Sequence, residues 1–236
     1  MLWYKGWLET RFRILFMLSY AVFPIPLLTM TQHVATPGHT ASLAEASGAL
    51  GFFAFYYSII PLMLAGSGIK TQIDIQARKG LHGSMYFTLS LPVSRLRLFA
   101  TRAGLGMLEA AGVLAIAPCA AWIMFPSLWT HITGADLFAY WVTFSVCTSA
   151  FYSVGVLLST FLDDVWQNMI SMFGVMFLWG LLSRPFLPTS LNIFRAMGQS
   201  SPLFTHTLPW ASMGIAFGAA AILLLAALKV VQTREY

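Results

Sequence analysis

One carboxylate stands out among the residues whose chemistry could serve a function. Glu109 lies about seven residues into a long apolar stretch, roughly 10 Å along a helix axis at about 1.5 Å per residue. Inserting an ionisable group at that depth costs roughly 2–3 kcal/mol, so such residues usually face a charged partner or a wet cavity. Glu109 is therefore a candidate functional residue. A structural pair with Arg102, two helical turns earlier, is the competing interpretation.

The other reactive groups form no familiar constellation. The sequence has no Gly-x-Ser-x-Gly, His-Glu-x-x-His or Cys-x-x-Cys motif, the short signatures of several hydrolases and metal or thiol sites. None of the five histidines lies at helical ligand spacing from another: His33, His39, His82, His131 and His206. We expect no metal site, no catalytic site and no cofactor held by this chain.

Two further motifs have simpler explanations. The segment "GSGIKT" (Gly66–Thr71) resembles a phosphate-binding loop, but Ile69 stands where that motif has Gly, and no strand is expected before it. We therefore predict no nucleotide site there. The pair Asp163–Asp164 is adjacent in sequence, so the two carboxylates do not face each other on a helix. Their position suits stabilisation of a helix N-terminus.

The distribution of charge predicts the elements that position these residues. Of 236 residues, 58% are hydrophobic and only 9% are charged, against roughly 25% charged in a soluble domain. About 20 apolar residues suffice to cross a bilayer as a helix. Asp, Glu, Lys and Arg are absent from 14–44, 46–69, 110–135, 137–162, 165–183 and 196–228. The sequence therefore predicts an all-α, polytopic membrane protein with six transmembrane helices.

Basic residues predict the orientation of these helices. In a six-span arrangement, only Arg184 and Arg195 fall on one side. The other side holds Lys5, Arg11, Arg13, Lys70, Arg78, Lys79, Arg95, Arg97, Arg102, Lys229 and Arg234. Basic residues near span ends stay cytoplasmic, so both termini should face the cytosol. The net charge of +5 thus reports topology, and we expect membrane lipid, with no nucleic acid, as a partner.

We expect a single transmembrane domain over 1–236, with spans at 14–30, 50–68, 103–125, 137–159, 168–182 and 210–228. Residues 2–13 mix aromatic with basic side chains, which favours a helix on the membrane surface or a plain flank of the first span. The external segment 183–209 combines four prolines with apolar residues. It is expected to be either re-entrant, with its backbone covered by protein or water, or an interfacial loop.

The last predicted span carries a small-residue motif. "GIAFG" places Gly214 and Gly218 one helical turn apart, a spacing that lets two helix backbones approach closely. Helix packing within the chain is the favoured use, and a contact with another subunit is the alternative.

The loop 69–102 is the longest expected cytoplasmic connection. Its segment "FTLSLPVSRLRLF" (87–99) is apolar up to Leu91, turns at Pro92, and continues with arginines among apolar residues. This pattern predicts a short helix, a turn and a basic amphipathic segment, which a soluble partner could grip. A solvated linker with phosphate-contacting arginines is the alternative.

The stretch "KGLHGSMYFTLSLPVSRLRLFATRAG" resembles the loop between the second and third spans of bacterial type-two ABC exporter permeases. The matching pieces are Lys79–Gly80, Gly83–Ser84, Thr88–Leu91 and Pro92–Arg95. The likeness extends over the chain through the "KGWLETRFR" start, the six spans, the apolar segment between the last two spans and the "REY" end. Family members often have an acidic residue before the Lys/Arg-Gly pair, where this chain has Gln76 and Ala77.

The resemblance implies a permease subunit in the bacterial cytoplasmic membrane. It would pair with a second copy or a paralogue and dock cytosolic ABC ATPase subunits, which bind ATP and Mg and drive export. The loop would act as the coupling helix, through Gly80, Gly83, Ser84, Phe87, Leu89, Leu91, Pro92 and Arg95. A polytopic membrane enzyme using Glu109, and a membrane scaffold or sensor that binds a partner without transport, are the alternatives.

Overall fold

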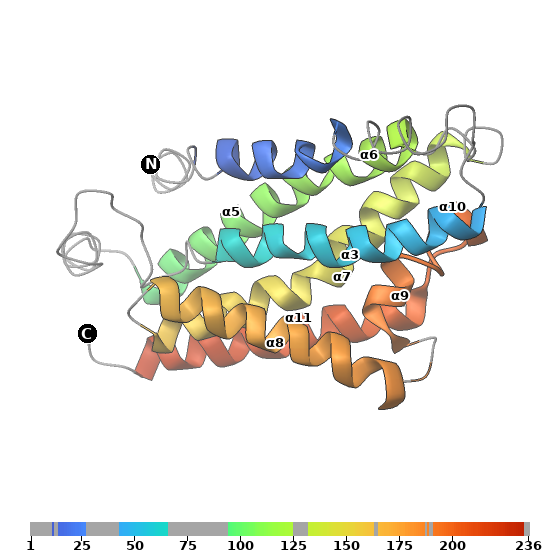
Figure 1. Ribbon diagram of the computed structural model, residues 1–236. Coiled ribbons are helices and arrows are strands. Elements are labelled where there is room, and N and C mark those ends of the chain that lie inside the picture. The colour runs from blue at the N-terminus through green and yellow to red at the C-terminus, as the bar shows by residue number, and fades with distance from the viewer. Residues whose placement is uncertain are drawn as a thin grey trace.

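The fold is helical throughout the residues that the computed structural model describes (Figure 1). The described residues are 11, 14–26, 43–65, 94–124, 132–162, 165–186, 188 and 191–233. Within them there is no strand, in agreement with the predicted all-α class.

An apolar helix over Ile14–Pro26 comes first. The labelled helices then follow in the order α3 (Leu43–Ala65), α5 (Arg95–Leu114), α6 (Ile116–Met124), α7 (Gly134–Phe161), α8 (Val165–Phe186), α9 (Ile193–Met197), α10 (Pro202–Thr205) and α11 (Trp210–Thr233).

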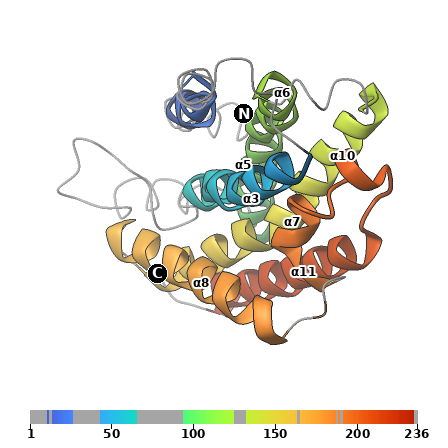
Figure 2. The same ribbon diagram turned by 45° about the vertical axis from the view of Figure 1, so that its right-hand side comes forward.

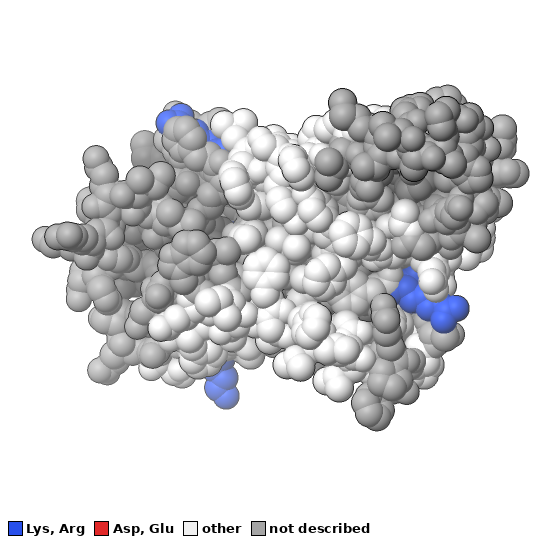
Figure 3. Space-filling view, in the orientation of Figure 1, with Lys and Arg blue, Asp and Glu red and all other residues white. Residues whose placement is uncertain are grey.

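Three of the described helical stretches are long and apolar enough to cross a membrane: Arg95–Ile123, Gly134–Phe161 and Trp210–Thr233. Three shorter apolar helices lie at the other predicted spans: Ile14–Pro26, Ala49–Ala65 and Ile170–Leu182. Charged side chains are scarce between the ends of the bundle. Figure 3 shows, on one face, basic atoms toward the two ends and a middle band of uncharged side chains. These helices indicate a membrane protein, as the composition predicts.

Helix α7 is the central element of the bundle, and Figure 2 shows it surrounded by other helices. It packs against α3, α5, α6, α8, α9, α10 and α11. The most apolar stretch of α7 is 61% buried, whereas that of α11 is only 22% buried. A residue of α7 therefore has to fit several neighbours, while much of α11 faces outward.

Small hydroxyl side chains let α7 occupy this position. Thr148, Ser149, Ser153, Ser159 and Thr160 are all buried. Each donates to a backbone oxygen three or four residues earlier in the same helix, at 2.6–2.8 Å. This back-bonding satisfies the hydroxyls without a partner on another helix. Small polar residues can therefore lie in an apolar interior.

Pro24 interrupts the first helix, and an aromatic side chain repairs the interruption. Proline has no backbone N–H, so the carbonyl four residues earlier, that of Tyr20, loses its helical donor. The Tyr56 hydroxyl of α3 donates to that oxygen at 2.7 Å. The rings of Tyr20 and Tyr56 also stack, with centroids 4.3 Å apart and planes 6° from parallel. This contact attaches the first helix to α3.

A second proline explains why the third predicted span consists of two helices. Pro118 cannot donate to the carbonyl of Leu114, and the chain turns at Ala115 between α5 and α6. The Ala115 N–H donates to Gly112 O at 3.2 Å, a contact three residues back. The carbonyl of Ala111 instead accepts from Trp141 Nε1 of α7, at 2.9 Å. An indole thus replaces a backbone donor at the bend.

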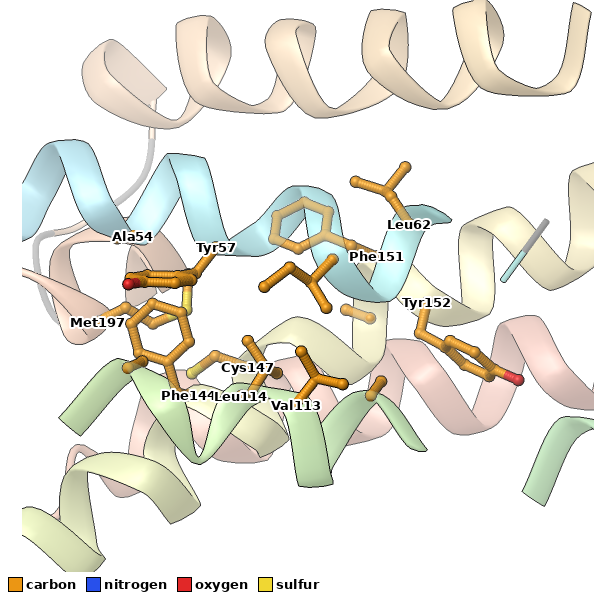
Figure 4. Close-up of a cluster of buried hydrophobic side chains, with 14 of the residues drawn as sticks. Ala54, Tyr57, Leu62, Val113, Leu114, Phe144, Cys147, Phe151, Tyr152 and Met197 are labelled. Carbon is orange, nitrogen blue, oxygen red and sulfur yellow. The ribbon is translucent and has the colours of Figure 1, made fainter. Parts of the chain in front are cut away.

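The core between α3 and α7 is aromatic (Figure 4). Tyr57 of α3 is 1% exposed and Phe144 of α7 is 0% exposed. Their rings meet edge to face, with centroids 6.2 Å apart, a favourable arrangement for two aromatic quadrupoles. Gly155 allows a close approach further along α7, because a Cβ there would lie 2.5 Å from both Ala65 Cβ and Met172 Sδ.

Several predicted boundaries differ from the structure. The second span, expected at 50–68, is the helix α3 over Leu43–Ala65. Residues 95–102, assigned to the loop, are the first two turns of α5, because Leu98 and Phe99 are buried and continue the apolar face of that helix. Within the segment 183–209, α8 runs to Phe186, and α9 and α10 fold back onto the bundle.

Candidate functional site

Most of the predicted coupling residues lie outside the described residues. These are Gly80, Gly83, Ser84, Phe87, Leu89, Leu91 and Pro92. The same holds for the predicted surface helix 2–13, of which the structure describes Arg11 alone. The described chain resumes at Ser94, so the attachment of the predicted coupling loop to the bundle can be followed residue by residue.

Ser94 and Arg95 form that attachment. The Ser94 side chain caps α5 by accepting from Arg97 N at 3.3 Å, the usual role of serine before a helix. The exposed side chain of Arg95 reaches the end of α11, where Nη1 donates to Val231 O and Gln232 O, at 3.3 Å each. A cation at this position complements the carbonyls and the negative end of the α11 dipole. The start of α5 is thereby held to the end of α11.

Further basic side chains accompany this contact. Arg97 and Lys229 are exposed, and Arg102 is partly buried two turns into α5. Arg97 and Arg102 lie near the start of α5, and Lys229 lies near the end of α11. Arg95 holds these two helix ends together. This end of the bundle is therefore basic, as expected for a cytoplasmic surface.

Glu109 is partly buried on α5, and its Oε2 atom is fully enclosed. The Tyr152 side chain of α7 lies near its carboxylate. The Tyr152 hydroxyl donates to Ala103 O at 2.9 Å, and it lies directly against Gly106, where a Cβ would collide with it. Arg102 Nη1 is also enclosed. The structure thus places Glu109 on the packed α5–α7 side, and both interpretations of this residue remain predictions.

Gly214 and Gly218 lie on the outward side of α11. A Cβ built at either position meets no atom within 4 Å among the described residues. Their neighbours on that side are exposed apolar side chains, including Phe217 and Ile222 at 67% and 70%. Residues buried against the rest of the bundle, such as Ala216, lie on the opposite side. The two glycines therefore leave an open surface on α11.

The segment of α9 and α10 is more deeply placed than sequence reasoning indicates. Phe194 lies between Phe55 of α3 and Phe151 of α7, with ring centroids 6.1 Å and 5.3 Å apart. Gly198 approaches Gly51 so closely that a Cβ on Gly198 would lie 2.8 Å from Gly51 Cα. The apolar residues within 183–209 were the available signal, since a solvated loop has no use for them. The residues of α3 and α7 against which they pack are distant from them in the sequence.

A polar cluster at the start of α7 was missed. Thr133 and Asp136 form a reciprocal capping box, which the pattern Ser/Thr-x-x-Asp/Glu could have indicated. His206 Nδ1 lies 3.0 Å from Asp136 Oδ2. No local pattern connects these two residues, because 69 positions separate them in the sequence.

The described residues contain no group of three His, Cys, Asp or Glu side chains that could hold a metal ion. Comparisons with protein-family models, curated proteins and solved structures gave no match to this chain. What the chain does is therefore argued from its residues and their arrangement.

Proposed function

We propose that this chain is the permease subunit of an ATP-binding cassette exporter in the bacterial cytoplasmic membrane. In this proposal the six apolar helices all span the membrane and both termini face the cytosol. The chain pairs with a second copy or a paralogue and uses ATP that a separate ATPase subunit hydrolyses with Mg. The proposal rests on the sequence resemblance of the loop that ends at Arg95.

The contact of Arg95 with α11 is the observation that carries the mechanism. A subunit that receives work from a cytosolic partner needs a firm connection between its docking loop and its transmembrane helices. Arg95 is the last residue of the matched Pro92–Arg95 stretch, and its guanidinium holds the start of α5 to the end of α11. A displacement of the loop would therefore move the start of α5 and the end of α11 together.

The distribution of polar groups supports a membrane subunit whose loop faces the cytosol. Basic side chains gather at the end of the bundle where the loop attaches, which favours the cytoplasmic orientation of the loop. The buried hydroxyls of α7 bond within their own helix. Because each hydroxyl donates within its own helix, α7 can lie in the apolar interior of a membrane bundle.

Co-purification tests the proposal. The tagged protein is extracted from its native membrane in mild detergent after cross-linking, and the accompanying proteins are identified. We expect an ATPase with Walker motifs, and we expect the double variant Leu89→Asp/Leu91→Asp to lose it. The matched control Leu89→Met/Leu91→Met keeps the apolar surface and should retain the partner.

Two results would count against the proposal. If no ATPase accompanies the wild-type protein, the coupling role is wrong, and an enzyme or scaffold becomes the better hypothesis. If the ATPase binds equally to the Asp and Met variants, the loop is not its docking element.

A further inference from the structure

Helix α11 lies along one edge of the bundle (Figures 1 and 2) and has two unlike sides. The side against the other helices carries the buried residues Ser212, Met213, Ala216, Ala220, Ala227 and Val231. The outward side carries large apolar residues that are 65–71% exposed: Trp210, Phe217, Ile222 and Leu225. Of the three helices long enough to cross a membrane, α11 is the most apolar, yet its apolar stretch is only 22% buried. The outward side therefore has to meet apolar material outside this chain.

Two different side chains bound this outward side. Trp210 is exposed at one end and Lys229 near the other, with no charged residue between them. The 19 positions from 210 to 229 span about 28 Å at about 1.5 Å per residue, close to the roughly 30 Å hydrocarbon core of a bilayer. Tryptophan and lysine both favour the boundary between membrane and water. The spacing therefore fits an outward side that lies in lipid along its whole apolar length.

The ammonium group of Lys229 is not used inside the described part of the chain. It forms no ion pair with a described residue. A lysine near a helix C-terminus can serve the last carbonyls, but those of Val231 and Gln232 already accept from Arg95. The exposed ammonium can therefore meet an anion that lies beside α11.

We propose that the outward side of α11 is a binding surface for an anionic phospholipid, whose phosphate contacts Lys229. The acyl chains lie along Leu225 and Ile222, which precede Lys229 by four and seven positions. At about 1.5 Å per residue both lie within the roughly 15 Å that one leaflet contributes to the hydrocarbon core. A lipid of this kind brings a negative headgroup to the ammonium and apolar chains to the exposed side chains.

A second copy of the chain is the competing occupant. Gly214 and Gly218 leave open space on this side of α11, and such glycines can let another helix approach. Two copies in one membrane have the same orientation, so a symmetric contact through this side would place two Lys229 ammonium groups at one level. Like charges repel at short range, whereas a phospholipid supplies the opposite charge. These observations favour lipid on this side, with the proposed second subunit packed elsewhere on the bundle.

Native mass spectrometry of the purified, delipidated full-length protein tests the surface. The protein in a neutral detergent is titrated with phosphatidylglycerol, which is anionic, or phosphatidylcholine, which is zwitterionic. One basic side chain near an anionic headgroup adds about 5-fold to the affinity. We expect the wild type to prefer phosphatidylglycerol. Lys229→Gln should bind it about 5-fold more weakly and bind phosphatidylcholine as before.

Two control variants make the charge effect specific. Lys229→Arg keeps the charge at the same position and should keep the wild-type affinity for phosphatidylglycerol. Arg195→Gln removes an exposed cation of α9, toward the other end of the bundle (Figure 1), and should also leave that affinity unchanged.

Two further measurements separate a phospholipid from other occupants. Inorganic phosphate should not displace phosphatidylglycerol at equal concentration, because it has no acyl chains to lie on α11. Gly218→Leu adds an apolar side chain where a Cβ meets no atom within 4 Å among the described residues. It should leave the number of chains per particle unchanged, as light scattering would show.

Four results would overturn the proposal. These are no preference of the wild type for phosphatidylglycerol, an unchanged affinity in Lys229→Gln, an equal loss in Arg195→Gln, and displacement of the lipid by inorganic phosphate. Separation of a dimer by Gly218→Leu would overturn it as well, by making this side a subunit contact. None of these readings depends on an ATPase partner, so the lipid surface and the proposed function can fail separately.

Discussion

Replacing Tyr56 with phenylalanine isolates the repair of the Pro24 interruption. The change removes the hydroxyl that donates to Tyr20 O at 2.7 Å and leaves a ring that can still stack on Tyr20. The Tyr20 carbonyl then has no donor from Pro24 and none from residue 56. We therefore expect a loss of stability that comes from the unmade hydrogen bond and hardly at all from packing.

The structure indicates the size of this loss. A buried polar group left without its partner costs about 1–3 kcal/mol. Tyr56 is only partly buried, so the lower part of that range, about 1–2 kcal/mol, applies. In a chain of 236 residues this corresponds to a fall in melting temperature of about 2–8 °C.

A double-mutant cycle provides the decisive assay. Pro24→Ala restores a backbone N–H that can donate to Tyr20 O within the first helix. In that background Tyr56→Phe should cost less than half as much, because the carbonyl now has a donor of its own. Thermal unfolding of the four proteins in one detergent gives the coupling. An undiminished loss in the Pro24→Ala background would refute the reasoning, since the hydroxyl would then act through something other than the interrupted carbonyl.

Two further predictions concern packing and coupling. Gly155→Ala places a Cβ 2.5 Å from Ala65 Cβ and Met172 Sδ, so it should destabilise the protein by about 1–3 kcal/mol. The control is Gly174→Ala, because a Cβ at Gly174 meets no atom within 4 Å among the described residues. This control variant should not lower the melting temperature. Arg95→Gln removes the guanidinium that holds the end of α11. This variant should still co-purify with the ATPase, but the transport obtained per ATP hydrolysed should fall at least by half. The control variant Arg97→Gln should behave like the wild type. Equal ratios of transport to hydrolysis in the Arg95 and Arg97 variants would contradict the role given to Arg95.

Helix positions could be read from the sequence because charge is costly in an apolar bundle. The charge-free stretches 137–162 and 196–228 contain most of α7 and the whole apolar part of α11. Pro118 likewise marks the bend after α5, since the missing N–H acts locally. These features depend on residues a few positions apart, which a single sequence displays.

Long-range contacts could not be read in this way. No local sequence pattern indicates that His206 contacts Asp136. Likewise, none indicates that Phe194 lies between Phe55 and Phe151, which are distant from it in the sequence. The apolar content of 183–209 indicated burial, but the surface that receives it forms only when α3 and α7 have packed. The same holds for Arg95, whose partners on α11 are backbone oxygens and carry no side-chain signature.

The bonding of α7 also has a mechanical consequence. The hydroxyls that donate within α7, such as those of Ser153 and Ser159, do not fix the position of α7 relative to its neighbouring helices. Trp141 and Tyr152 instead donate to backbone oxygens of α5 from positions three turns apart. Two such attachments resist both sliding and rotation of α5 against α7. A displacement of α5 would therefore be passed to α7 through these two bonds.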